Sequence, residues 1–105
     1  MTVSDSTGYL ALEGRVDALY APELDEQLSA LHKAGARDII IDLQDVSYMS
    51  SSGLRILLLA HRRQRAEGGQ IVLANTPERV LRILRMAGFD QLFEFEPSES
   101  HEDTA

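Results

Sequence analysis

The sequence predicts a single α/β domain in which a mixed, mostly parallel sheet of four to five strands packs against helices. Short β-branched runs alternate with longer segments whose apolar residues recur at helical spacing, and Gly or Pro stands at most boundaries. Strands that are separated by helices pair in parallel. A chain of 105 residues can bury one hydrophobic core but not two.

The first strand is expected over residues 9–17, where apolar side chains recur at a rough period of two at Leu10, Leu12 and Val16. Gly14 interrupts this pattern, which indicates a bulge or a close backbone approach. The polar residues 1–8 that precede it form either a loose start or a short edge strand.

The first helix is expected to open at Pro22 and to stop at Gly35. Leu24, Leu28 and Leu31 follow one another at i, i+4 and i+7, which places one apolar face on the sheet.

A short buried strand is expected over residues 37–43, and a second helix follows the serine segment 50–54. This helix has cationic residues in its last turn and stops at Gly68. Six of the seven residues 54–60 are apolar, which is too many for one buried stripe. Either two sides of the helix are covered within the fold or part of it meets a partner.

The last elements are a strand over residues 70–74, a third helix and a final short strand at residues 92–95. Thr76 is expected to cap the third helix, Pro77 to be its first residue and Gly88 to end it. We expect the folded domain to span residues 1–96 and residues 97–105 to be an acidic, disordered tail.

Composition narrows the function classes. The net charge is −7, and residues 86–105 hold six acidic residues and no Lys or Arg, so nucleic-acid binding is disfavoured. The absence of cysteine excludes disulfides and thiolate metal sites. Neither a membrane-spanning run nor a signal peptide is present, which predicts a cytoplasmic protein without membrane insertion.

The residue types and their spacing in the sequence give little support for a metal, cofactor or catalytic site. The three histidines lack ligand spacing. Asp42 and Asp45 could hold Mg²⁺, although such acids more often end a strand and start a turn. No phosphate-cradling glycine loop occurs. A nucleophile elbow around Ser51 would need Gly where Met49 stands, and only Gly53 matches. We therefore expect no metal, no cofactor and no enzyme activity.

The simplest role for the serine segment is to cap the helix that follows it, and one serine suffices for that. Three serines followed by Gly53 are more than capping requires. Residues 39–54, Ile-Ile-Ile-Asp-Leu-Gln-Asp-Val-Ser-Tyr-Met-Ser-Ser-Ser-Gly-Leu, resemble the signature of STAS domains, specifically bacterial anti-sigma factor antagonists. Residues 14–17, 75–77 and 86–89 resemble further family motifs in the same order along the chain.

This resemblance implies a partner-switching protein and no catalyst. In that family the domain binds an anti-sigma factor with a GHKL-type ATPase fold and thereby frees a sigma factor. The anti-sigma factor is also the kinase that phosphorylates the serine two residues before the motif glycine, and a PP2C-type phosphatase removes the phosphate.

The matching phosphoacceptor here is Ser51, with Ser52 and Ser50 as alternatives, and Ser50 stands where the family often has Asp. A monomer is the default oligomeric state. The resemblance also leaves open a regulatory or scaffolding subunit of another complex without a kinase cycle, in lipid transport by an ABC system, in type III secretion or in stress signalling. The residues expected to bind the partner are Asp17, Met49, Ser50, Ser51, Ser52, Gly53, Leu54 and Arg55.

Overall fold

The computed structural model of the chain describes residues 1–96, which form five strands and three helices in one sheet-centred domain. The expected tail at residues 97–105 lies outside the described residues. The elements are β1 (Thr2–Ser4), β2 (Thr7–Val16), α1 (Ala21–Lys33), β3 (Asp38–Met49), α2 (Ser51–Ala66), β4 (Gln70–Ala74), α3 (Glu78–Met86) and β5 (Glu94–Glu96).

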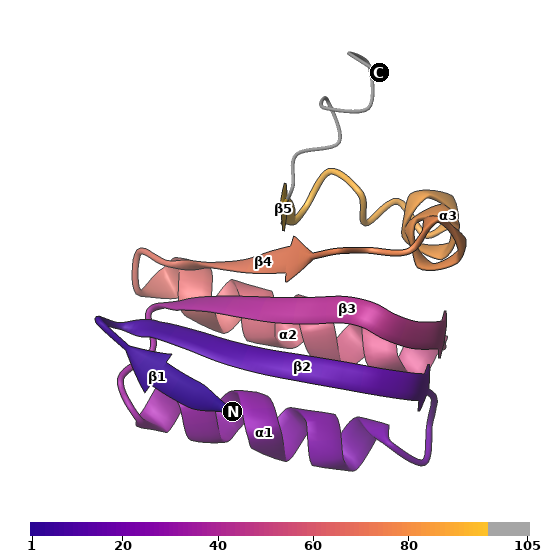
Figure 1. Cartoon of the computed structure of the whole chain (residues 1–105). Helices are drawn as coiled ribbons and strands as arrows, with labels where there is room; N and C mark the ends of the chain where they lie inside the picture. The colour runs from indigo at the N-terminus through magenta and orange to yellow at the C-terminus, as the bar shows by residue number, and fades with distance from the viewer. Residues whose placement is uncertain (97–105) are drawn as a thin grey trace.

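The sheet has the order β1-β2-β3-β4-β5, so sequence order and spatial order coincide. Only β1 is antiparallel to its neighbour, and the three other pairs are parallel because a helix separates each pair along the chain. The fold class predicted from the sequence is confirmed, and the start of the chain forms one edge strand of the sheet. Helices α1 and α2 lie behind the strands in Figure 1, while α3 lies beyond the end of β4.

The core lies between the sheet and the two helices behind it. Alternate residues of the strands face this layer, and they meet the leucine face of α1 and one side of α2. Residues with no exposed surface at this interface include Val16, Leu24, Leu28, Ile39, Ile41, Leu43, Leu57, Ile71 and Leu73.

β3 corrects the expectation of a short central strand, because it continues to Met49 and does not end near Leu43. Its pairing with β4 stops at Asp42, yet its pairing with β2 resumes after a register shift between Ala11 and Glu13. A second shift follows Gly14, whose φ is +75°, so the expected irregularity in β2 is confirmed. The two bulges keep β2 and β3 paired up to the serine segment.

The start of α3 corrects a second expectation. Thr76 does not cap the helix, because α3 begins at Glu78 and Pro77 occupies the capping position with no side-chain cap. Within the described residues, the Thr76 hydroxyl is buried without a hydrogen-bond partner. The final strand also begins at Glu94 and not at Leu92.

Two buried polar side chains of α2 connect this helix to the rest of the domain. Gln64, which is fully buried, donates to the carbonyl oxygens of Ala36 at 2.9 Å and Arg37 at 2.7 Å. Its Oε1 lies 2.9 Å from Nδ1 of His32 on α1. Gln64 therefore links α1, α2 and the start of β3.

His61 links α2 to β4. Its Nδ1 accepts a hydrogen bond from the Ile71 amide at 3.2 Å, and its ring stands edge-on to Phe93 with centroids 5.0 Å apart. Burial lowers the pKa of His61, and the nearby Arg65 charge lowers it further. The neutral imidazole is thus the form that the folded domain favours.

Candidate functional site

The serine segment lies at the edge of the sheet where the parallel strands end. Val16 and Met49 are paired there as the last residues of β2 and β3. The Ser50 amide donates to the Val16 carbonyl oxygen at 2.8 Å and so continues this pairing into the start of α2. Asp17 follows Val16 directly, which brings the two sequence motifs to the same edge.

Ser50 caps α2, as one of the interpretations of the serine segment expects. Its backbone is extended, with φ −86° and ψ 171°, and its Oγ accepts from the Gly53 amide at 3.2 Å. Its carbonyl oxygen also accepts from the Leu54 amide at 3.0 Å. Such a cap typically stabilises a helix by about 1 kcal/mol. The hydroxyl of Ser50 is therefore already in use within the fold.

Gly53 permits close packing of the helix start on the strand ends. A Cβ at this position would lie 2.8 Å from Met49 Sδ, 2.9 Å from Val16 Cγ1 and 3.1 Å from the Val16 carbonyl oxygen. These distances are shorter than normal contacts, so only glycine fits without a shift. The motif glycine thus fixes where α2 begins relative to β2 and β3.

The three serines differ in accessibility. Ser51 is exposed, whereas Ser50 and Ser52 are half-buried. The first turn of α2 holds no acidic residue, and the exposed Arg55 follows one turn later. The positive end of the helix dipole and the charge of Arg55 together favour an anion at the start of α2.

A shallow apolar groove of about 350 Å³ lies beside Ser51, between the end of β3 and α3. Met86 is 83% exposed at this groove, and Leu19 is 91% exposed in the turn after β2. A contiguous apolar groove that carries an exposed side chain such as Met86 is typical of surfaces that bind other proteins, whereas a singly exposed residue such as Leu19 is not diagnostic. The groove is lined by Tyr48, Met49, Ser51, Leu54, Ile83, Met86 and Ala87.

The carboxylate of Asp17 holds the turn between β2 and α1. It accepts from the amides of Leu19 at 3.1 Å and Tyr20 at 3.2 Å and lies 3.8 Å from Nε of Arg15. The Arg15 guanidinium in turn stacks on the Tyr48 ring, 4.4 Å from its centroid. Asp17 therefore orients the loop that carries Leu19.

The structure brings the predicted binding residues together at one edge, but it does not expose all of them. Met49, Gly53 and Leu54 are buried, and of these Met49 and Leu54 line the groove. Leu19, Ile83 and Met86 were not predicted as site residues. The motif-like residues 75–77 and 86–89, which stand at the two ends of α3, are the signals in the sequence that point to this helix.

The possible Mg²⁺ ligands are placed differently from the expectation that they flank a strand end. Asp42 and Asp45 both lie within β3, and the Asp42 carboxylate accepts from the Gln44 amide at 2.9 Å and from Asn75 Nδ2 at 3.2 Å. Among residues 1–96, no group of three or more His, Cys, Asp or Glu side chains could hold a metal ion. Across the same residues, no helix has the length and apolar character needed to cross a membrane.

Fold and site together define a small α/β domain that exposes a serine-rich helix start at one edge of its sheet. The chain belongs to the STAS domain family, whose family model matches residues 1–103.

Curated and solved relatives agree with this assignment. The anti-sigma-B factor antagonist of Bacillus subtilis (strain 168) is 35% identical over 83 residues, which cover 79% of this chain and 75% of that protein. The structure of the anti-sigma factor antagonist SpoIIAA in its unphosphorylated form has a TM-score of 0.79 at 24% identity and covers 99% of this chain and 91% of that one. The Bacillus cell fate determinant SpoIIAA in its phosphorylated form gives 0.72 at 21% identity, covering 99% and 95%. The two structural likenesses show the fold.

Proposed function

We propose that the chain is an anti-sigma factor antagonist that is switched off by phosphorylation of Ser51. It binds an anti-sigma factor of GHKL ATPase fold in the cytoplasm and thereby frees a sigma factor. The bound anti-sigma factor is the kinase, and a PP2C-type phosphatase restores the antagonist. Ser51 is then a substrate of its partner, and the domain itself is no enzyme. The name of the Bacillus subtilis relative supports this proposal.

The exposure of Ser51 is the observation that carries the choice of phosphoacceptor. A kinase must reach the hydroxyl, and Ser51 is the exposed member of the triplet. The Ser50 hydroxyl is occupied by the Gly53 amide, and Ser52 is half-buried. Ser51 also lines the groove that holds the exposed Met86, so a modification there lies within the proposed binding surface.

The free domain can carry the phosphate without loss of stability. A phosphoserine adds a charge of about −1.5 to −2. At the first residue of α2, where the first turn has no acidic residue, the helix dipole stabilises this charge by about 0.3–1 kcal/mol. Phosphorylation is therefore expected to leave the fold intact.

The bound state responds in the opposite way. In an interface built on the apolar groove, the phosphate loses its water and faces Met86, Tyr48 and Ile83. An unpaired charge in such a place costs several kcal/mol, roughly 2–5 in comparable interfaces. Because each 1.4 kcal/mol changes affinity about tenfold, one phosphate is enough to release the partner.

The test uses the purified chain and the GHKL-type anti-sigma factor encoded in the same genome. Wild type, Ser51→Ala and Ser51→Asp are compared by titration calorimetry, with Ser52→Asp as a charge-matched neighbour. Ser51→Asp is expected to bind at least about tenfold more weakly than wild type. If Ser51→Asp binds as tightly as wild type, the switch at this serine is wrong. If wild type binds no such partner, the chain serves another complex.

A further inference from the structure

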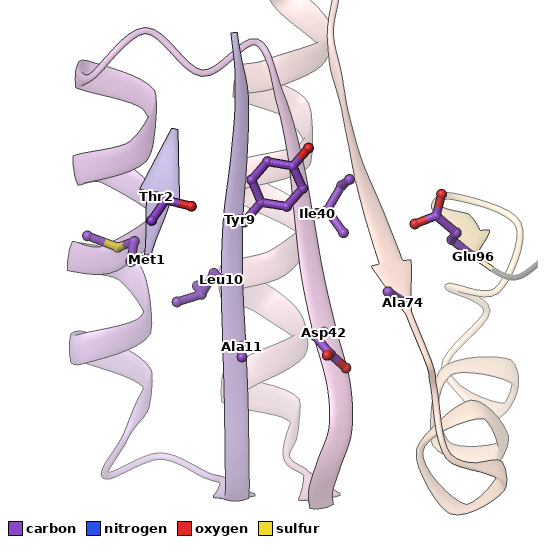
Figure 2. A pocket seen from close by; sticks show the side chains of 9 residues that line it. All are labelled: Met1, Thr2, Tyr9, Leu10, Ala11, Ile40, Asp42, Ala74 and Glu96. Carbon is purple, nitrogen blue, oxygen red and sulfur yellow. The ribbon is translucent and has the colours of Figure 1, made fainter. Parts of the chain in front are cut away.

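The face of the sheet opposite α1 and α2 carries its own organised surface. Strand register places side chains there in three transverse rows, while the residues between them point into the core. The second of these rows joins all five strands. Figure 2 shows three of its members, Thr2, Tyr9 and Ile40, beside the third row. The rows are Ser4, Thr7, Asp38 and Gln70; Thr2, Tyr9, Ile40, Val72 and Glu94; and Ala11, Asp42, Ala74 and Glu96.

An apolar strip runs along the middle row. Tyr9 is 43% exposed and pairs with Ile40, which pairs with Val72, and both of these remain half-buried. A pocket of about 430 Å³ lies along Tyr9 and Ile40 and the neighbouring row, and its lining includes residues from all five strands, from Thr2 of β1 to Glu96 of β5. Five strands at about 4.8 Å spacing make this surface about 19 Å wide.

The charged residues of these three rows are all acidic. Asp38, Asp42, Glu94 and Glu96 belong to the three rows, and none of the residues in the rows is Lys or Arg. Glu94 and Glu96 are exposed at the end of the apolar strip, and Asp42 lies beside Ile40 within the pocket. An apolar strip flanked by carboxylates is complementary to a ligand with apolar and cationic groups.

We propose that this sheet face, which we call the acidic face, binds an amphipathic helix of a partner protein with Lys or Arg beside its apolar side. An amphipathic helix is the element that covers sheet faces in α/β domains, as α1 and α2 do on the opposite side. A width of about 19 Å matches a helix of about 13 residues. The cationic side chains pair with Glu94, Glu96 and Asp42, while the apolar side covers Tyr9 and Ile40.

Charge excludes the nearest alternative occupants. The same face of a second copy would place Asp42 and Glu96 opposite like charges. The chain's own residues 97–105 contain Glu99, Glu102 and Asp103 and no Lys or Arg. A basic partner is the occupant that the charges favour.

The acidic face is separate from the serine groove. No residue lines both, because the pocket on the acidic face lies across the middle of the sheet and the groove lies at the end of β3. A partner helix on the acidic face therefore leaves Ser51 accessible, and the domain can hold two partners at once. This proposal does not depend on phosphorylation of Ser51.

The test uses a synthetic amphipathic peptide of about 18 residues built from Leu and Lys, and a second peptide in which Glu replaces every Lys. Binding to the ¹⁵N-labelled chain is followed by amide chemical shifts and by fluorescence anisotropy. The expected result is saturable binding of the Lys peptide alone, with the largest shifts at Tyr9, Ile40 and Val72. Equal binding of the Glu peptide, largest shifts at the serine groove, or no binding of the Lys peptide would overturn the proposal.

A charge-reversed variant makes the test specific. Glu94→Lys with Glu96→Lys is compared with Asp25→Lys with Glu26→Lys, which changes the net charge equally at exposed positions of α1. The first variant is expected to weaken the Lys peptide about tenfold and the second to leave it unchanged, with both folded by circular dichroism. Equal weakening by both variants overturns the proposal. So does self-association of wild type in sedimentation that the first variant abolishes, because the occupant is then a second copy.

Discussion

Replacing Gly53 with Ala tests the idea that the serine segment is held in place by close packing of α2 on the strand ends. The new methyl group would lie 2.8 Å from Met49 Sδ and 2.9 Å from Val16 Cγ1. Both neighbours are buried, and the Val16 carbonyl oxygen at 3.1 Å belongs to the backbone that bonds Ser50. The start of α2 must therefore shift away from the sheet.

The magnitude follows from two opposing effects. Overpacking of a buried site costs about 1–3 kcal/mol. Replacing Gly by Ala in a helix returns up to about 1 kcal/mol, because Ala has the higher helix propensity. Because two buried side chains and one backbone oxygen crowd the new methyl group, the overpacking cost is expected in the upper part of its range, about 2–3 kcal/mol. Subtracting the propensity gain leaves a net loss in the free energy of unfolding of about 1–2 kcal/mol. For a domain of this size, that loss lowers Tm by roughly 4–16 °C.

Urea and thermal unfolding followed by circular dichroism measure this loss. Ser52→Ala, in the same helical turn, is the matched control and is expected to stay within about 0.5 kcal/mol of wild type. The Gly53→Ala variant is also expected to bind the partner more weakly than wild type, because Ser51 moves with the helix start. A Gly53→Ala variant with wild-type stability would show that the close packing at Met49 and Val16 is not real.

Three further outcomes are expected from stability measurements. Ser50→Ala is expected to lose about 1 kcal/mol in urea unfolding, because the Gly53 amide loses its cap, and an unchanged midpoint would contradict the capping role. Gln64→Leu is expected to lose about 2–4 kcal/mol, because the buried Ala36 carbonyl oxygen and the partly buried Arg37 carbonyl oxygen lose their donor, and a loss below that of Ser50→Ala would refute this. Since folding lowers the pKa of His61, the unfolded chain binds more protons below about pH 6.5, and stability is expected to fall as pH drops through this range. His61→Gln is expected to show a smaller fall in Tm between pH 7.5 and 5.5, whereas an identical fall would assign the effect to other groups.

The order and type of the main elements could be predicted because each depends on local sequence. The leucines of α1 recur at helical spacing, and Gly14, Gly35 and Gly68 mark positions where the backbone has positive φ. Strands and helices can be assigned without knowledge of their packing partners only where the local sequence pattern agrees with the final structure, as it does here.

The length of β3 could not be predicted in this way. Asp42, Gln44 and Asp45 are typical of a strand end, yet pairing with β2 beyond a bulge carries the strand on to Met49. The bulge depends on the partner strand, and no pattern within β3 itself reveals it. Tertiary pairing overrides local preference here.

The candidate site could be predicted only in part, because strand order brings some of its residues together and tertiary packing brings the others. Asp17 and the serine segment directly follow β2 and β3, which are adjacent and parallel, so their meeting at one edge follows from the strand order. Met86 lines the groove from α3, and Leu19 is exposed in the turn after Asp17. The exposure of both side chains depends on packing that single positions do not encode.

Phosphorylation of the purified chain by its anti-sigma factor tests the central claim most directly. Wild type and Ser51→Ala are incubated with the anti-sigma factor and ATP, and intact-mass and peptide mass spectrometry locate the phosphate. The proposal predicts one phosphate on Ser51 in wild type, none in Ser51→Ala, and loss of the complex as wild type is modified. Phosphate on Ser50 or Ser52, or a modified chain that keeps its partner, would contradict it.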